Sequence, residues 1–154
     1  MRAVVQHEVE VAAPASVVWG YVTDWPRQGE WIPMTRVEAV DAANGVGGQV
    51  RAWTGLGPIG FWDTMTITAW EECADGSGRC EVLHTGAVVS GDGEFAVVAR
   101  GQDRCTFVWW ERLTVPAGPL GAAAWKATAP LVRKGFGTAL TRMAARVEEQ
   151  HGAG

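Results

Sequence analysis

Apolar and polar residues alternate along the first segment of the chain, residues 3–12. Gln6, Glu8 and Glu10 occupy the polar positions. A period of two places successive side chains on opposite faces of a strand, so the pattern predicts a strand with one buried face. The residues of that buried face are Val5, His7, Val9 and Val11.

Two short helices are predicted directly after this strand. Pro14 suits the start of a helix, because the N–H that proline lacks has no helical partner there. An apolar run then continues to Val22. Asp24-Trp25-Pro26 ends that helix and opens a second one, which runs to Trp31-Ile32-Pro33.

Strand patterns separated by turn residues fill the middle of the chain. Their connections are short, which favours antiparallel neighbours over parallel crossovers. Gly91-Asp92-Gly93 lies inside one of them and favours a bulge. The predicted strands cover residues 36–41, 49–54, 61–70, 79–85, 88–100 and 104–115.

The last segment, residues 120–150, changes to a helical period. Its apolar residues recur every three or four positions and form one stripe on a long amphipathic helix. Pro130 lies within it and predicts a kink or a break, because proline removes a backbone donor. The stripe consists of Trp125, Ala129, Val132, Phe136, Leu140, Met143 and Val147.

This order of elements predicts an α+β fold, with helices gathered on one side of a curved antiparallel sheet. At 154 residues the chain suits a single domain, 1–154. A curved sheet wrapped round a long helix leaves space between them. We therefore expect an internal cavity between the helix stripe and the concave face of the sheet.

Composition argues against several classes of protein. Apolar residues make up 47% of the chain and the formal charge is −4, which argues against disorder and against nucleic acid as a partner. No apolar run is long enough for a transmembrane helix or a signal peptide. The three cysteines lack CxxC spacing and are interpreted as reduced thiols. These features predict a cytoplasmic protein without stable membrane insertion.

Tryptophan is unusually frequent, with nine in 154 residues. One interpretation is a core that happens to use tryptophan. The other is a cavity lined with aromatic rings, suited to a flat or apolar ligand. The candidate wall residues are Trp31, Trp53, Phe61, Met65, Phe95, Trp109, Trp125, Val132 and Phe136.

Three ionisable residues stand on apolar strand faces and are the candidates for acid or base catalysis. Asp63 alternates with Phe61 and Met65, Glu111 alternates with Trp109, and His84 follows Cys80 and Val82 at a period of two. An apolar pocket raises the pKa of a carboxyl group, which allows the group to act as an acid or a base near neutral pH. The alternatives are a bulge that turns each residue outward, or an ion pair of Glu111 with Arg51 or Arg112.

The sequence gives little support for dinucleotide binding or metal binding. Gly55-Leu56-Gly57-Pro58-Ile59-Gly60 fits the GxGxxG string, but a strand pattern follows where a dinucleotide site needs a helix. A hairpin loop at the cavity mouth is the better interpretation. The three histidines are scattered and no cysteine pair has zinc spacing. We therefore expect no metal and no cofactor.

The layout resembles the START/Bet v 1-like superfamily, also called SRPBCC, and in particular its polyketide cyclase/dehydrase-like members. The resemblance covers nearly the whole chain and implies a helix-grip fold that binds lipids, sterols, polyketides or aromatic compounds. It carries over no catalytic residue. The segments that carry it are Val9-x-Val11-x-x-Pro14, Val17-Val18-Trp19, Asp24-Trp25-Pro26, Trp31-Ile32-Pro33, the glycine-rich segment 44–48, and Phe136, Leu140 and Glu148.

Three functions stay open from the sequence. The first is binding of a hydrophobic small molecule in the cavity. The second is a cyclase, aromatase or dehydratase that uses Asp63, Glu111 and His84 in the same cavity. The third is a regulatory or interaction module that docks through its sheet or its basic helix. The protein is expected to be a monomer or a homodimer.

Overall fold

The computed structural model describes residues 1–41 and 44–152. Two α-helices, one 3-10 helix and seven strands are formed by these residues. In chain order they are β1 (Arg2–Val11), α1 (Ala15–Val22), η1 (Trp25–Glu30), β2 (Thr35–Ala39), β3 (Gln49–Leu56), β4 (Ile59–Glu72), β5 (Gly78–Thr85), β6 (Ser90–Ala99), β7 (Cys105–Thr114) and α2 (Gly118–Gly152).

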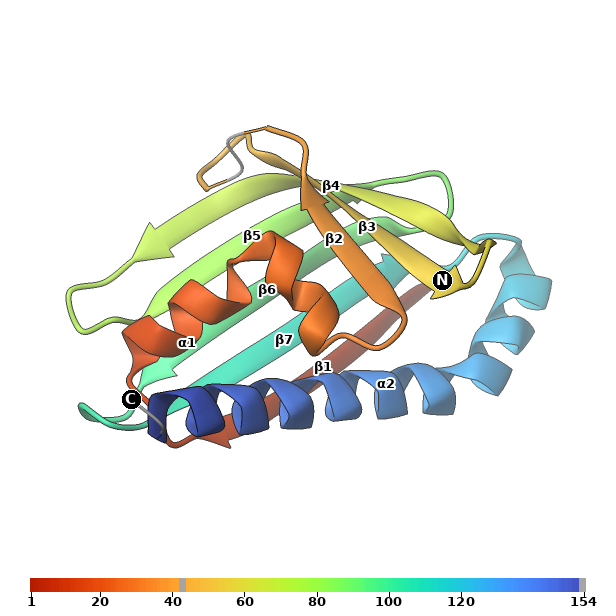
Figure 1. The fold of residues 1–154 in the computed structure, drawn as a ribbon. Helices are drawn as coiled ribbons and strands as arrows, with labels where there is room; N and C mark the ends of the chain where they lie inside the picture. Colours follow the sequence, from red (N-terminus) through yellow and green to blue (C-terminus); the bar gives the residue numbers. More distant parts are fainter. Residues whose placement is uncertain (42–43, 153–154) are drawn as a thin grey trace.

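The strands form one antiparallel sheet in the order β1-β7-β6-β5-β4-β3-β2. Figure 1 shows a strongly curved sheet, with α1, η1 and α2 gathered on one side of it. The predicted α+β arrangement is therefore confirmed. Strand alternation also holds, since Val5 and Val11 of β1 are buried while Gln6, Glu8 and Glu10 are exposed.

Among the strands that the structure describes, one bulge interrupts the ladders, and it does not lie where the sequence predicted it. The pairing of β6 with β5 and β7 runs without a break through Gly91-Asp92-Gly93, so the bulge expected there is wrong. The register shift lies instead in β4, between Ile67 and Ala69. It changes which residues face inward, and Trp70 consequently packs edge-on against Trp19, with 5.1 Å between ring centroids.

The long helix α2 is continuous across Pro130, so the break that the sequence allowed does not occur. The kink does occur, and Figure 1 shows α2 changing direction in its light-blue N-terminal part. The predicted stripe faces the sheet. Ala129, Leu140, Met143 and Val147 are buried, whereas Val132 and Phe136 are only half-buried. This less buried stretch of the stripe is where the cavity lies.

The GxGxxG string closes the β3–β4 hairpin. Gly55 pairs with Gly60 and Leu56 with Ile59, which leaves Gly57-Pro58 as the two-residue turn. Gly57 has φ +57°, a left-handed conformation that glycine adopts without strain. Because no helix follows the string, its backbone N–H groups are not arranged as in a dinucleotide site.

Candidate functional site

A cavity of about 380 Å³ lies between the concave face of the sheet and α2. Its wall is built mainly from apolar side chains of β2 to β7, η1 and the segment after it, and α2. Met34 and Leu131 line it and are themselves largely exposed, so the cavity opens to solvent between the end of η1 and the kinked part of α2.

Six of the nine predicted wall residues line this cavity. The rings of Trp109 and Phe136 stack within this wall, with 4.0 Å between their centroids. That contact joins β7 to α2 and closes one side of the space. The six residues are Phe61, Met65, Phe95, Trp109, Val132 and Phe136.

Trp31 supports the wall from behind and does not line the cavity. Its side chain is fully buried, and the rings of Phe95, Phe107 and Trp109 surround it at centroid distances of 6.0 Å each. Its ring nitrogen has no hydrogen-bond partner among the residues that the structure describes. The short helix η1 ends just before Trp31 and inserts it into the core.

Trp53 and Trp125 also lie outside the cavity wall. On β3 the inward residues are Val50, Ala52 and Thr54, so Trp53 points to the outer face of the sheet. There it packs against Trp62, which is its direct partner in the β3–β4 ladder. Trp125 is half-buried in the N-terminal part of α2. Tryptophan content alone could not separate the two faces of a strand.

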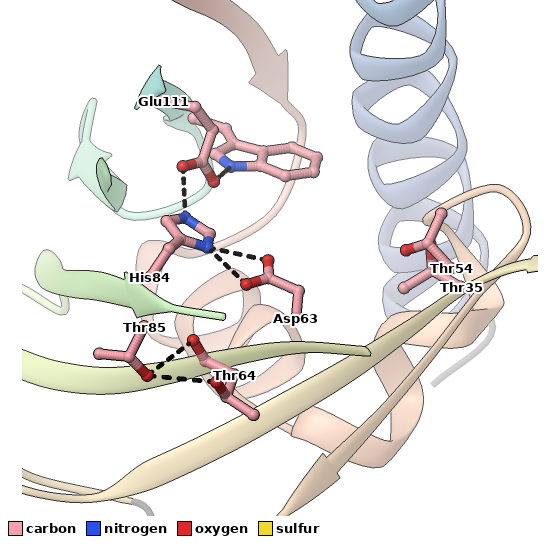
Figure 2. Close-up of polar contacts among 8 residues, drawn as sticks. Thr35, Thr54, Asp63, Thr64, His84, Thr85 and Glu111 are labelled. Carbon is pink, nitrogen blue, oxygen red and sulfur yellow. Dashed lines mark hydrogen bonds and ion pairs between the residues drawn. The ribbon is translucent and has the colours of Figure 1, made fainter. Parts of the chain in front are cut away.

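The three predicted acid–base residues meet inside the cavity and form one hydrogen-bonded cluster (Figure 2). His84 Nδ1 lies 2.8 Å from Asp63 Oδ2, and His84 Nε2 lies 2.7 Å from Glu111 Oε2. Trp109 Nε1 donates to the other oxygen of Glu111 at 2.8 Å. All three ionisable side chains are at most 13% exposed. We call Asp63, His84 and Glu111 the acidic cluster.

Sheet order explains how these residues meet. Asp63 is on β4 and His84 on the neighbouring β5, but Glu111 is on β7, two strands and about 10 Å away from β5. The carboxylate of Glu111 crosses the intervening β6 directly above Gly93, its ladder partner. A Cβ at position 93 would overlap Glu111 Oε2, so glycine is the residue that leaves this path open.

Both ion pairs weighed for Glu111 from the sequence are wrong. Arg51 binds Glu38 at 2.8 Å and Arg112 binds Asp92 at 2.7 Å, each on the outer face of the sheet. The inward-facing carboxylate of Glu111 is paired with His84 instead. The alternation pattern had placed Glu111 on the correct face, but it could not identify the partner.

The cluster holds His84 in its charged form. Burial by itself lowers the pKa of His84, but the hydrogen bonds and charges of Asp63 and Glu111 outweigh burial and raise the pKa to about 10. The cluster therefore holds one imidazolium between two acidic side chains, a formal charge of −1.

This pKa predicts that stability falls as the pH rises above neutrality. The pKa of His84 is about 10 in the folded protein and 6.5 in the unfolded chain. Its contribution to the free energy of unfolding is therefore complete below pH 6.5 and is lost progressively as the pH rises to about 10. The free energy of unfolding should fall by up to about 1.4 kcal/mol per pH unit within this window. Urea denaturation at several pH values between 6.5 and the onset of thiol ionisation measures this slope.

The matched control replaces the whole cluster by neutral residues, Asp63→Asn, His84→Gln and Glu111→Gln, here called the neutral triple variant. Its stability should be nearly independent of pH over the same range. The pH range ends below the ionisation of the cysteine thiols. Burial raises the pKa of Cys80 to about 12 and of Cys105 to about 11, so thiol ionisation in the unfolded chain would add its own pH dependence to the free energy of unfolding. A flat profile in the unmodified protein would contradict a charged His84.

Several wall residues were not predicted from the sequence. Thr35 and Thr54 line the cavity, and their hydroxyl oxygens lie 3.2 Å apart. Figure 2 shows this pair apart from the acidic cluster, on the β2–β3 side of the site. Cys80 also lines the cavity, but its raised pKa keeps it a neutral thiol. Period-two alternation along β3 and β5 is the signal that could have identified Thr54 and Cys80.

Metal binding and membrane spanning find no structural support in the described ranges. Within residues 1–41 and 44–152, no group of three or more His, Cys, Asp or Glu side chains could hold a metal ion. Both ring nitrogens of His84 are already bound to carboxylates. Over the same residues, no helix combines the length and the apolar character needed to cross a bilayer.

Solved structures with the same fold come from several sources, all at low sequence identity. The Zhui aromatase/cyclase from a Streptomyces species is 21% identical, with a TM-score of 0.72 over 97% of this chain and 96% of that chain. A START superfamily protein from Mycobacterium smegmatis is 18% identical, with a TM-score of 0.64 over 96% of this chain and 95% of that one. These similarities establish the helix-grip fold.

Norcoclaurine synthase from Thalictrum flavum, solved with dopamine and hydroxybenzaldehyde, has the same fold at 18% identity and a TM-score of 0.64, over 98% of this chain and 88% of that one. A search of curated proteins gives no match. The family model for polyketide cyclase/dehydrase and lipid transport proteins matches residues 2–148. The chain therefore belongs to the polyketide cyclase/dehydrase and lipid transport family.

Proposed function

We propose that this protein binds a hydrophobic, ring-bearing small molecule in the cavity between the sheet and α2. The main observation in support is an apolar cavity of about 380 Å³ whose wall contains the buried acidic cluster. Small-molecule sites combine these two features, because apolar walls supply affinity and a few polar groups fix orientation. The family description, which names polyketide cyclases and lipid transport, supports the same class of ligand.

Filling the cavity should abolish this binding. Val132 lies on the half-buried part of the α2 stripe and lines the space, so Val132→Trp puts an indole where the ligand would lie. We expect the Kd of an aromatic probe such as 2-naphthol to rise at least about tenfold, measured by isothermal titration calorimetry. Binding by the unmodified protein should carry a negative heat-capacity change, because apolar surface is buried.

Ala127→Trp is the matched control, since residue 127 is exposed on the same helix. It should leave the Kd of the probe unchanged. If Val132→Trp also left binding unchanged in a folded protein, the probe would be binding elsewhere. Native mass spectrometry with a set of aromatic and lipid molecules widens the search, and failure of every one of them to bind would contradict the proposal.

The acidic cluster favours a second function, acid–base catalysis on a carbonyl compound held in the cavity. A carboxylate can take a proton from the carbon next to a ketone and leave an enolate, which is the first step of an aldol cyclisation. The enolate carbon then attacks a second carbonyl, and the proton goes to the new oxygen. The aromatase/cyclase with the same fold makes this reaction class relevant to the chain.

The hydrogen bonds suggest a different role for each member of the cluster. Glu111 accepts from both Trp109 and His84, so both of its oxygens are already engaged by the protein. Asp63 shares only the His84 Nδ1–H and is the more exposed carboxylate, so it is the better base. The proton that Asp63 takes up is then the one returned to oxygen. Glu111 and His84 are positioning residues, because Glu111 holds the imidazolium and the imidazolium holds Asp63.

Proton abstraction can be tested without knowing the natural substrate. Proton NMR in D₂O follows exchange at the carbons next to the carbonyl of 2-tetralone, a ring-bearing ketone. We expect the protein to accelerate this exchange and Asp63→Asn to reduce the acceleration by about a hundredfold. Affinity for 2-naphthol should persist in the same variant, because the apolar wall is intact.

Asp92→Asn is the control for the loss of one carboxylate. Asp92 lies on the outer face of β6 and binds Arg112 at 2.7 Å, remote from the cavity. Its substitution should leave exchange unaffected. An exchange rate in Asp63→Asn equal to that of the unmodified protein would exclude Asp63 as the base and leave binding as the function of the site.

A further inference from the structure

The charged groups of the cavity wall are strongly biased toward acidic residues. Asp63 and Glu111 are the carboxylates that point into the cavity, while no lysine or arginine lines it within the described ranges. Glu94 borders the cavity, but its side chain shares the outer face of β6 with Asp92 and is paired with Arg79, whose Nε lies 2.7 Å from its carboxylate. The acidic cluster therefore decides the local charge that a bound molecule meets.

His84, the positive group of the cluster, has no free donor to offer a ligand. Its two ring N–H groups already donate to Asp63 and to Glu111. An anionic ligand group would meet two carboxylates, and it would have to break one of these hydrogen bonds to reach the imidazolium. In a site of low dielectric such a placement is strongly unfavourable.

The basic residues of α2 do not compensate for this charge. Arg133 and Lys134 line a separate shallow groove, together with His7 of β1 and Arg142. The residues of the same helix that line the cavity are Leu131, Val132, Gly135 and Phe136. The helix therefore separates its cations from the ligand space and presents apolar side chains to it.

The carboxylates retain the capacity to accept further hydrogen bonds. Each carboxylate oxygen has two lone pairs. Asp63 receives one N–H, from His84, shared between its two oxygens, so acceptor positions remain open. A hydroxyl or an ammonium group donates to such positions, and an ammonium group also gains from the net negative charge. The hydroxyls of Thr35 and Thr54 supply a second, neutral polar contact across the site.

We propose that the cavity selects ring-bearing molecules carrying a neutral or cationic hydrogen-bond donor, and rejects anionic molecules of the same shape, such as aromatic or fatty carboxylates. This selectivity rests on the proposed binding function and adds a chemical class to it. It follows from the orientation of the cluster, which turns both imidazolium donors to the protein and leaves carboxylate acceptors for the ligand.

Three probes of matched shape test the selectivity: 2-naphthol, 2-naphthylmethylammonium and 2-naphthoate, titrated calorimetrically at neutral pH. We expect 2-naphthoate to bind at least about tenfold more weakly than 2-naphthol, and the ammonium compound to bind at least as tightly as 2-naphthol. Equal or tighter binding of 2-naphthoate in the unmodified protein would overturn the inference while leaving the binding function intact.

Two variants locate the origin of the selectivity. In the neutral triple variant the preference over 2-naphthoate should shrink to less than about threefold, because the site charge is gone. Glu38→Gln removes one charge from the outer face of β2, where Glu38 binds Arg51, and should leave the preference unchanged. A preference that survives in the folded triple variant would overturn the inference. Failure of all three probes to bind the unmodified protein would contradict the binding function itself.

Discussion

Replacing His84 by leucine should lower the free energy of unfolding at neutral pH by about 3–5 kcal/mol. The substitution preserves most of the side-chain volume but leaves Asp63 and Glu111 buried without the cation that binds both. Two carboxylates in one apolar site cannot both stay ionised cheaply, so one must take up a proton. Urea denaturation followed by circular dichroism measures the loss.

Two comparisons make this result specific. The deficit of His84→Leu should shrink at mildly acidic pH, because a proton on one carboxylate then costs less. The neutral triple variant should recover much of the lost stability, since no uncompensated charge stays buried. A loss below about 1 kcal/mol for His84→Leu would mean that water or rearrangement already compensates the two carboxylates, contrary to the buried geometry described above.

Replacing Trp31 by alanine should cost about 3–5 kcal/mol and should weaken ligand binding only through the disturbed wall. The indole is fully buried and packs against Phe95, Phe107 and Trp109, so its removal leaves a large void behind the cavity. The same denaturation experiment measures the loss, and crystallography of the variant would locate the void.

Trp62→Ala is the matched control for the loss of an indole. Trp62 is half-exposed on the outer face of the sheet, where it contacts Trp53 and lies beneath the guanidinium of Arg51. Its removal should cost only about 1–2 kcal/mol. If Trp31→Ala were no more destabilising than Trp62→Ala, Trp31 would not support the wall as the packing indicates.

The acidic cluster is costly for folding, which argues for its role in binding or catalysis. Burying two carboxylates and an imidazolium contributes less to stability than apolar packing of similar volume would. The chain nevertheless leaves residue 93 without a side chain, so that Glu111 can cross β6 to reach His84. Polar groups that a fold accommodates at such expense concentrate at functional sites.

Local patterns predicted the elements and the faces on which key residues lie. Alternation placed Asp63, His84 and Glu111 on inward strand faces, and the three-to-four spacing placed Val132 and Phe136 on the inner stripe of α2. Such assignments succeed because a side chain's direction depends on the geometry of its own strand or helix. The same rule would have excluded Trp53, whose neighbours Ala52 and Thr54 point inward.

By itself, then, the sequence determined the α+β architecture, the kink in the last helix and the inward direction of each acid–base candidate. Only the tertiary structure decided that these candidates form a single cluster, that Gly93 clears the path of Glu111, and that Trp31 lies behind the wall. The physical reason is that periodicity is a local property of the chain. Contacts between β4, β5 and β7 depend instead on strand order and register, which the folded sheet alone sets.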